Sequence, residues 1–415
     1  MKASDDILVI GGGIVGVSTA IWLQRKGFAV TIVDREGFAA GTSYGNAGIL
    51  AASSVIPVTT PQLLPKIPSM LFGRDTPLFL RWTYLPKLLP FLLHYLGHAN
   101  RKDVKRIAEG LANLMHDSAE QHYALAKGTP AERYMKHSDY LHVYPSRQAF
   151  EKDAAGWETR TELGYGYTEL DAAGLAEYDP ALANRFGYGV LCPESGQITD
   201  PGEYTRALGQ HFIDQGGRLE IAAVEEIITE NGRAVGIRTS AGEMQASRIV
   251  VASGAWSGDM VRKLGLKVPM ESERGYHVEY VNPNLHFRVP FMVTEAKFAV
   301  NSMEGRLRCA GVAEFGGLAA GPSRQPVEYL KRRTASLFPD LEYDDVRVWM
   351  GHRPSTTDSM PMIGTLPNVP NVWAGFGHQH LGLTGGPKTG RWLAQLVSGE
   401  MPNTDLTAYA PDRFS

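Results

Sequence analysis

A short apolar run, a glycine-rich turn and a helix open the chain, and this order constrains its fold more than any other feature. Residues 7–10 (ILVI) predict a buried strand, residues 11–16 (GGGIVG) match the pattern G-x-G-x-x-G, and apolar residues at helical spacing continue through 17–23. In this pattern the first glycine makes a tight turn, the second lets a pyrophosphate approach the backbone, and the third lets helix and strand pack closely. Free amides at the helix N-terminus bind the pyrophosphate. The predicted contacts are Gly11, Gly13, Ile14, Val15 and Gly16.

A carboxylate follows the second predicted strand, residues 29–33. Asp34 lies 23 residues after Gly11, where an acid can accept hydrogen bonds from a ribose hydroxyl. The same charge repels the 2'-phosphate of NADP and therefore disfavours that cofactor. The alternative is a glycine-rich loop without a ligand, but strand, helix and terminal acid together favour a dinucleotide. The pattern alone does not separate FAD from NAD.

Composition and charge are those of an ordinary globular enzyme. The 415 residues are 43% hydrophobic and 20% charged, and the formal net charge of -3 gives no electrostatic reason to expect nucleic acid as a partner. Cys192 and Cys309 stand far apart, so neither a disulfide framework nor a metal site is expected. No apolar run reaches the roughly 18 residues of a membrane span, and no signal-peptide pattern precedes residues 7–10. These observations predict a cytoplasmic protein.

Strand and helix patterns further along predict an α/β protein with two interleaved domains. Residues 246–257 predict a buried strand that adds to the nucleotide-binding sheet, and Asn231-Gly232 predicts a hairpin turn. A C-terminal strand is expected at 372–378, followed by a glycine-rich loop and a last helix at 389–396. We assign residues 1–53, 196–265 and 344–415 to the nucleotide-binding domain, and residues 54–195 and 266–343 to a mostly antiparallel second domain.

Residues 61–106 form an apolar insertion that is interrupted by prolines and ends in basic residues. The prolines permit only short helices, and a basic cluster follows at Arg101, Lys102, Lys105 and Arg106. One interpretation is that the insertion docks on an anionic membrane, at the inner face of the cytoplasmic membrane, where a quinone accepts electrons. The other is that it forms a lid or a domain interface.

Five glycine-rich motifs occur in an order that is typical of one family of flavoenzymes. They are residues 11–16, 41–48, 252–257, 351–364 (GHRPSTTDSMPMIG) and 375–390 (GFGHQHLGLTGGPKTG). Over nearly its whole length the chain resembles the D-amino acid oxidase superfamily, and within it the bacterial D-amino acid dehydrogenases, including relatives that act on D-hydroxyproline. The resemblance implies FAD rather than NAD, bound by a Rossmann-like domain interleaved with an antiparallel-sheet substrate domain.

The resemblance also implies a set of cofactor contacts beyond the first glycine turn. In this family the loop at 41–48 lies beside the ribityl chain and flavin ring, a backbone group at Val224 contacts adenine, and the C-terminal loop covers the isoalloxazine. The implied contacts are Asp34, Arg35, Ser43, Asn46, Ala47, Gly48, Val224, Gly254, Trp256, Gly377, Gly382, Leu383 and Thr384.

The catalytic candidates come from the same comparison. Arg353 matches the arginine that grips the substrate carboxylate, and its planar fork suits that task, although a surface ion pair is the alternative. His380 occupies a nearby position that is arginine in some relatives, and a packing role is its alternative. Tyr276 and His277 belong to a stretch that resembles the substrate-side strand, and strand alternation brings only one of them into the pocket. Lys297 matches a lysine of the dehydrogenase branch.

The resemblance, together with these residues, predicts FAD-dependent dehydrogenation of a small D-amino acid, with hydride transfer from Cα to flavin N5 and electrons passing to a quinone or another carrier. The flavin supplies the difficult chemistry, while the protein orients the substrate. The first alternative is a glycine, sarcosine or D-hydroxyproline type of secondary-amine oxidase that uses oxygen. Further alternatives are a flavoprotein subunit of a multisubunit dehydrogenase and an NAD-dependent hydroxy acid dehydrogenase.

Overall fold

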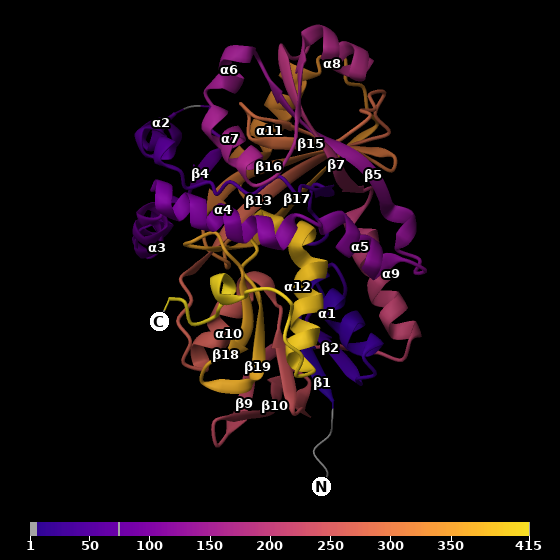
Figure 1. The fold of residues 1–415 in the computed structure, drawn as a ribbon, viewed down its shortest axis with the longest axis vertical. Coiled ribbons are helices and arrows are strands. Elements are labelled where there is room, and N and C mark those ends of the chain that lie inside the picture. The colour runs from indigo at the N-terminus through magenta and orange to yellow at the C-terminus, as the bar shows by residue number, and fades with distance from the viewer. Residues whose placement is uncertain (1–5, 74, 415) are drawn as a thin grey trace.

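Two sheets divide the protein into two halves, which are seen one above the other in Figure 1. The computed structural model describes residues 6–73 and 75–414. A six-stranded sheet forms the lower half and a ten-stranded sheet forms the upper half. Helix α4 (Arg101–Met115) crosses the molecule between them, in contact with α12 (Gly382–Val397). The predicted α/β fold with a second, mostly antiparallel sheet is confirmed.

The six-stranded sheet is built around the strand that opens the chain. Its order is β18-β19-β12-β1-β2-β8, and neighbouring strands are parallel except at β18. The strands are β1 (Ile7–Ile10), β2 (Val30–Asp34), β8 (Arg218–Ile221), β12 (Arg248–Val251), β18 (Met362–Leu366) and β19 (Val369–Phe376). Ile7 and Val9 pack into the core on one face, whereas Leu8 and Ile10 pack on the other. Both faces are covered, which explains why β1 is a continuous apolar run.

A small antiparallel sheet and a layer of helices cover the two faces of that parallel sheet. The small sheet contains β9 (Val224–Glu230), β10 (Arg233–Thr239) and β11 (Gly242–Gln245). The predicted hairpin at Asn231-Gly232 is confirmed, because both residues adopt positive φ angles of 48° and 74°. On the opposite face, α1 (Ile14–Arg25) packs against α12 and α9 (Pro201–Asp214).

The ten-stranded sheet has the path β17-β13-β16-β15-β14-β5-β7-β3, with β4 added to β16 and β6 added to β7. Its strands are β3 (Ile49–Leu50), β4 (Leu78–Leu80), β5 (Met135–Tyr144), β6 (Thr168–Asp171), β7 (Tyr188–Ile198), β13 (Met270–Val281), β14 (Phe291–Val293), β15 (Phe298–Met303), β16 (Arg306–Phe315) and β17 (Asp345–Thr356). Only the β14–β5 and β16–β4 pairs are parallel. Strand β17 lies within the third stretch that we assign to the nucleotide-binding domain, and it pairs along its length with β13.

The expected glycine-rich loop before the last helix is wrong in part, because α12 already begins at Gly382. Glycines inside this helix allow it to approach α1 very closely: a Cβ on Gly390 would lie 2.6 Å from the backbone nitrogen of Thr19. Packing against α1 therefore outweighs the low helix propensity of glycine. The other helices are α2 (Ile67–Phe72), α3 (Leu85–Gly97), α5 (Ser118–Ala126), α6 (Arg147–Glu151), α7 (Ala154–Glu162), α8 (Ala172–Tyr178), α10 (Ser257–Lys263) and α11 (Arg324–Leu337).

The insertion at 61–106 forms the left edge of the molecule in Figure 1, where α2 and α3 lie next to the start of α4. The expectation of short helices holds for α2 but is wrong for α3, which has 13 residues and contains Pro90. The four basic residues of the cluster are exposed, and Arg101 and Lys105 also border the cavity described below, while Ile107 and Leu111 are buried.

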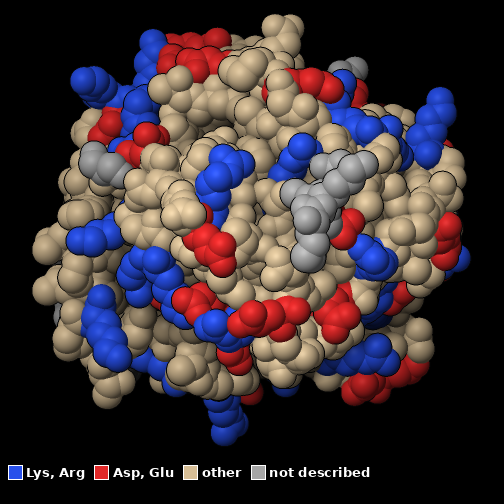
Figure 2. Space-filling view, turned by 90° about the horizontal axis from the view of Figure 1, so that it is seen from below, with Lys and Arg blue, Asp and Glu red and all other residues tan. Residues whose placement is uncertain are grey.

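Charge is mixed on the face that Figure 2 presents, where acidic and basic side chains alternate over the surface. Within residues 6–73 and 75–414, every helix is too short or too polar to cross a membrane.

Candidate active site

A cavity of about 1310 Å³ lies where the carboxyl ends of β1 and β2 face the ten-stranded sheet. Small-molecule pockets usually measure roughly 300–1,000 Å³, so this one has room for a large cofactor and a substrate together. Its wall combines the turn after β1, the loop at 41–48, the start of β9, the middle of β13 and the start of α12. Most of the predicted cofactor residues line it; Gly16, Gly48 and Gly377 lie behind the wall.

The first glycine turn uses its three glycines in three different ways. A Cβ on Gly11, whose φ is +119°, would lie 2.4 Å from the carbonyl oxygen of Ala252. A Cβ on Gly16 would lie 1.9 Å from the carbonyl oxygen of Gly11, so this glycine lets α1 pack on β1. At Gly13 the only close protein atom is Ser43 Oγ at 3.2 Å, and this position faces the cavity. Gly13 is therefore the place where a ligand can approach the backbone.

The loop at 41–48 covers the start of α1 and is held from both sides. The backbone amide of Ile14 donates a hydrogen bond to Ser43 Oγ at 2.9 Å. On the other side Asn301 Nδ2 donates to the carbonyl of Ala47 at 2.7 Å, and Arg308 Nη1 donates to the carbonyl of Asn46 at 2.5 Å. Asn301 and Arg308 come from the ten-stranded sheet and were not expected from the sequence. They fix the loop that carries Asn46 and Ala47 along the cavity.

Asp34 stands at the end of β2 and turns its carboxylate toward the glycine turn. Its Oδ2 accepts from the amide of Gly12 at 2.7 Å, and its Oδ1 accepts from the amides of Glu36 and Gly37 at 2.8 and 2.9 Å. The guanidinium of the next residue, Arg35, lies 3.9 Å from the ring centroid of Trp256. The carboxylate and the stacked pair form one end of the cavity wall.

The remaining predicted cofactor positions come from three separate segments. Val224 and Gly254 line the cavity near Asp34. Gly377 has a φ of +90° and packs against Thr356 instead. Leu383 and Thr384 belong to the first turn of α12, which has no side-chain cap and faces the cavity. A helix N-terminus of this kind favours negative charge.

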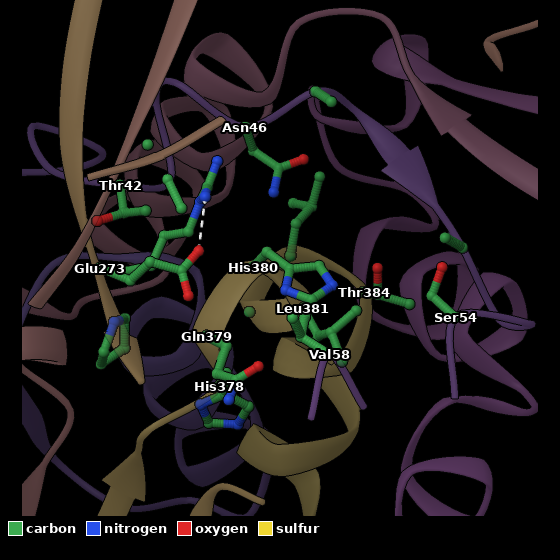
Figure 3. A pocket seen from close by; sticks show the side chains of 18 of the residues that line it. Thr42, Asn46, Ser54, Val58, Glu273, His378, Gln379, His380, Leu381 and Thr384 are labelled. Carbon is green, nitrogen blue, oxygen red and sulfur yellow. Dashed lines mark hydrogen bonds and ion pairs between the residues drawn. The ribbon is translucent and has the colours of Figure 1, made fainter. Parts of the chain in front are cut away.

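Arg353 faces the cavity, but its guanidinium is already paired. Nη1 donates to Glu273 Oε1 at 2.8 Å and to the carbonyl of Val312 at 2.9 Å, and Figure 3 shows the ion pair as a dashed line ending on Glu273. The two residues lie directly opposite each other on β13 and β17. Gly275 makes room for the pair, because a Cβ there would lie 2.3 Å from Arg353 Nη2. Glu273 was missed by sequence reasoning, since strand register is needed to find it.

His380 lies beside this ion pair and exposes its ring to the cavity, as Figure 3 shows. Burial lowers the pKa of His380, and Arg353 lowers it further, while Glu273 acts in the opposite direction. The imidazole is therefore neutral at pH 7 and can accept a proton.

Tyr276 and His277 lie on opposite faces of β13. Tyr276 lines the cavity, and its hydroxyl is bonded to Glu314 and to the amide of Ser323. His277 lies on the same face of β13 as Glu273, but its ring lies 3.1 Å from the carbonyl of Gly45, and His277 is not among the residues that line the cavity. Burial lowers the pKa of His277 to about 3. It supports the loop at 41–48 as a neutral packing residue.

Lys297 lines the cavity from the turn before β15, with a φ of +55°. Two further residues of this part of the wall were not expected as site residues. His142 follows Tyr140 on the same face of β5, and Arg160 lies on α7. The alternation of Tyr140, His142 and Tyr144 is visible in the sequence and could have drawn attention to this face.

A glycine turn at a helix start, a carboxylate after the next parallel strand and a large mixed cavity define a dinucleotide-binding oxidoreductase. The family model described as FAD dependent oxidoreductase (DAO) matches residues 6–396. The chain belongs to this family and is an FAD-dependent oxidoreductase.

Known proteins resemble the chain over its full length. It is 37% identical to a D-amino-acid oxidase of Bradyrhizobium diazoefficiens, over 100% of both chains. It is 30% identical to a D-amino acid dehydrogenase of Paramagnetospirillum magneticum, over 99% of both. Among solved structures, glycine oxidase from Geobacillus kaustophilus superposes with a TM-score of 0.75 at 21% identity, covering 98% of each chain. The fold is therefore shared with these flavoenzymes.

The residues present fit FAD. The backbone at Gly13 is open to the cavity, Asp34 is fixed by three amides, and the first turn of α12 has no side-chain cap. The turn at Gly13 would hold the pyrophosphate, and Asp34 would hold the ribose. When bound, the flavin supplies an acceptor for a hydride.

Proposed function

We propose that the protein oxidises a D-amino acid at the carbon that carries the amino group. The observation that carries this proposal is the ion pair of Arg353 and Glu273 inside the cavity. An amino acid has one group of each charge, and so does this pair. The relatives named D-amino-acid oxidase and D-amino acid dehydrogenase, which match the whole chain, support the same substrate class.

The ion pair is complementary to a zwitterion. The guanidinium of Arg353 would receive the substrate carboxylate, and the carboxylate of Glu273 would receive the ammonium group. A substrate that enters between them replaces one ion pair by two, so charge remains balanced in the site. Ser355 Oγ donates to Glu273 Oε2 at 3.2 Å and holds that carboxylate on the side away from Arg353.

A neutral amine is needed before a hydride can leave Cα. We assign Glu273 Oε1 as the acceptor of the ammonium proton, since this atom would lie against the ammonium group. The neutral imidazole of His380, which lines the same cavity, would stabilise the amine by a hydrogen bond. Arg353 keeps the substrate oriented during the reaction, which is its main contribution to the rate.

The proposal is tested by an anaerobic substrate panel with flavin bleaching as the readout. The panel contains D- and L-enantiomers of several amino acids, glycine, sarcosine and D-hydroxyproline. We expect at least one D-amino acid to bleach the flavin and its L-enantiomer to leave it oxidised. Bleaching by L-enantiomers at equal rates, or by sarcosine and glycine alone, would overturn the proposal in favour of another amine oxidation.

We further propose a quinone or another carrier at a membrane surface as the electron acceptor. This proposal is supported by the exposed basic cluster on α4 and by exposed apolar side chains in the insertion, namely Leu64, Trp82, Leu89 and Leu93 with exposed fractions of 44%, 53%, 49% and 63%. The rival acceptor is oxygen, and the D-amino-acid oxidase relative favours it.

The acceptor is identified by reoxidation of the reduced protein. We expect faster reoxidation by a quinone in vesicles of anionic lipid than by air-saturated buffer, and loss of this advantage in the double variant Trp82→Ser, Leu93→Ser. Fast reoxidation by oxygen with stoichiometric peroxide would identify an oxidase. Equal rates for anionic and neutral vesicles would remove the membrane surface from the proposal.

A further inference from the structure

The cavity continues past the ion pair of Arg353 and Glu273 into a region on β5 and α7. We call this region the distal lobe and define it by Tyr140, His142, Trp157, Arg160 and Lys297, all of which line the cavity. None of them belongs to the ion pair or to the FAD cradle, by which we mean the glycine turn at 11–16, Asp34 and the loop at 41–48. The lobe therefore requires an explanation of its own.

Arg160 is a half-buried cation whose only hydrogen-bond acceptors among the described residues are backbone carbonyls. Nε donates to the carbonyl of Ser53 at 2.8 Å, and Nη1 donates to the carbonyl of Gly156 at 3.1 Å. Its guanidinium lies 4.5 Å from the ring centroid of Trp157. Across residues 6–73 and 75–414, no carboxylate lies within ion-pair distance of Arg160, and no acceptor faces Nη2. A half-buried guanidinium without a counter-ion is available to pair with an anionic ligand.

His142 adds an unused nitrogen atom to the same lobe. Its Nε2 is buried and has no hydrogen-bond partner among the described residues. The ring meets Trp157 edge to face, with centroids 5.0 Å apart. Burial lowers the pKa of His142 far below its ordinary value, and the positive charges of Arg160 and Lys297 lower it further. The ring is thus neutral, and an Nε2–H can donate a hydrogen bond.

Trp157 holds the lobe together, because it contacts both Arg160 and His142. Its Nε1 donates to the hydroxyl of Tyr144 at 2.9 Å, which fixes the indole plane. Three carboxylates, Asp153, Glu158 and Glu162, also line the cavity beside α7, but none is in ion-pair contact with Arg160, and Asp153 acts on it only through space. The lobe therefore combines a guanidinium and an ammonium group with a neutral donor, and this set suits an anion.

We infer that the distal lobe binds the side-chain carboxylate of the substrate, so that the preferred substrates are dicarboxylic D-amino acids such as D-aspartate and D-glutamate. This inference rests on the proposed function. The ion pair would take the α-amino and α-carboxyl groups, while Arg160 and His142 would take the second carboxylate. The length of the preferred side chain then reports the spacing between the two sites.

The first test compares acids with their neutral amides in the holoenzyme. We expect kcat/KM for the best of D-aspartate, D-glutamate and D-2-aminoadipate to exceed that of its amide by about 10-fold or more, the value of one charge-assisted bond. Arg160→Gln should lower kcat/KM for the acid by about 10-fold or more and leave the amide within about 2-fold. For the acid, kcat/KM of Arg160→Lys should lie between the values of the wild type and of Arg160→Gln.

The matched control is Arg25→Gln. Arg25 also donates only to backbone carbonyls, those of Ala124 and Leu125 at 2.8 and 2.7 Å, but it does not line the cavity. This variant should not change the ratio of kcat/KM for the acid to kcat/KM for the amide. A ratio near one in the wild type, or an equal loss for acid and amide in Arg160→Gln, would overturn the inference.

A binding measurement separates this inference from the proposed function. Titration of the oxidised holoenzyme with glutarate and with butyrate, followed by flavin absorbance, should show tighter binding of glutarate, and Arg160→Gln should abolish the difference. If no D-amino acid bleaches the flavin, the proposed function fails, whereas equal binding of glutarate and butyrate overturns the distal lobe as an anion site.

Discussion

Arg353→Ala should raise the apparent substrate dissociation constant by at least ~100-fold, which corresponds to roughly 3 kcal/mol. The variant removes the only guanidinium in contact with Glu273 among the described residues, so it also leaves a carboxylate without its counter-ion in the cavity. That carboxylate repels the carboxylate of an incoming substrate. The loss of the guanidinium and the repulsion by Glu273 both weaken substrate binding, so the expected loss of affinity is large. Anaerobic titration monitored by flavin absorbance measures it.

Two companion variants separate charge from geometry. Arg353→Lys keeps the positive charge but loses the planar fork, so its affinity should lie between those of the wild type and Arg353→Ala. Glu273→Gln releases Arg353, and simple carboxylates should bind at least as tightly as before, while turnover falls because the proton acceptor is lost. Unchanged substrate affinity in Arg353→Ala, with normal flavin content, would remove Arg353 from the substrate site.

Gly16→Ala should yield a colourless protein of low stability. The new Cβ would lie 1.9 Å from the carbonyl oxygen of Gly11. The backbone of residue 16 and that of Gly11 cannot move apart without separating α1 from β1. Overpacking of this kind costs about 1–3 kcal/mol and occasionally more. The cradle is distorted at the same time, so FAD should be lost during purification.

Gly13→Ala is the companion variant, because it makes the same substitution three residues away, where the new Cβ would face the cavity instead of the backbone of Gly11. Gly13 has φ -78° and ψ 176°, a conformation that alanine adopts readily, and its nearest neighbour is Ser43 Oγ at 3.2 Å. The apoprotein should therefore retain its stability within about 1 kcal/mol. FAD affinity should fall by about 10-fold or more, because the methyl group occupies the approach of the pyrophosphate. Thermal unfolding with and without FAD, together with bound-flavin absorbance, measures both effects. Normal flavin content in Gly13→Ala would show that the cofactor does not approach there.

Features of the cradle could be predicted from the sequence because they are local. Strand, turn and helix follow one another between residues 7 and 25, and each glycine has a role set by its neighbours within a few residues. The hairpin at Asn231-Gly232 is local in the same sense, since both residues adopt the left-handed conformations that this turn requires.

The partners of the catalytic candidates could not be predicted, because they depend on strand register. Glu273 and Arg353 are 80 residues apart in the sequence and meet only because β13 and β17 pair with one particular alignment. A shift of one residue would turn Glu273 away from the cavity and bring its neighbour Arg274 there instead. For the same reason, the sequence could not show which of Tyr276 and His277 lies on which face of β13.

The sequence by itself determined the class of fold, the dinucleotide turn with its terminal carboxylate, and the membership of a flavoenzyme family, since these depend on short-range patterns and on motif order. Only the tertiary structure decided that Arg353 is paired with Glu273, that α12 begins at Gly382, and that Arg160 shares a lobe with His142. Contacts between distant segments follow from how whole faces pack, and no local pattern specifies them.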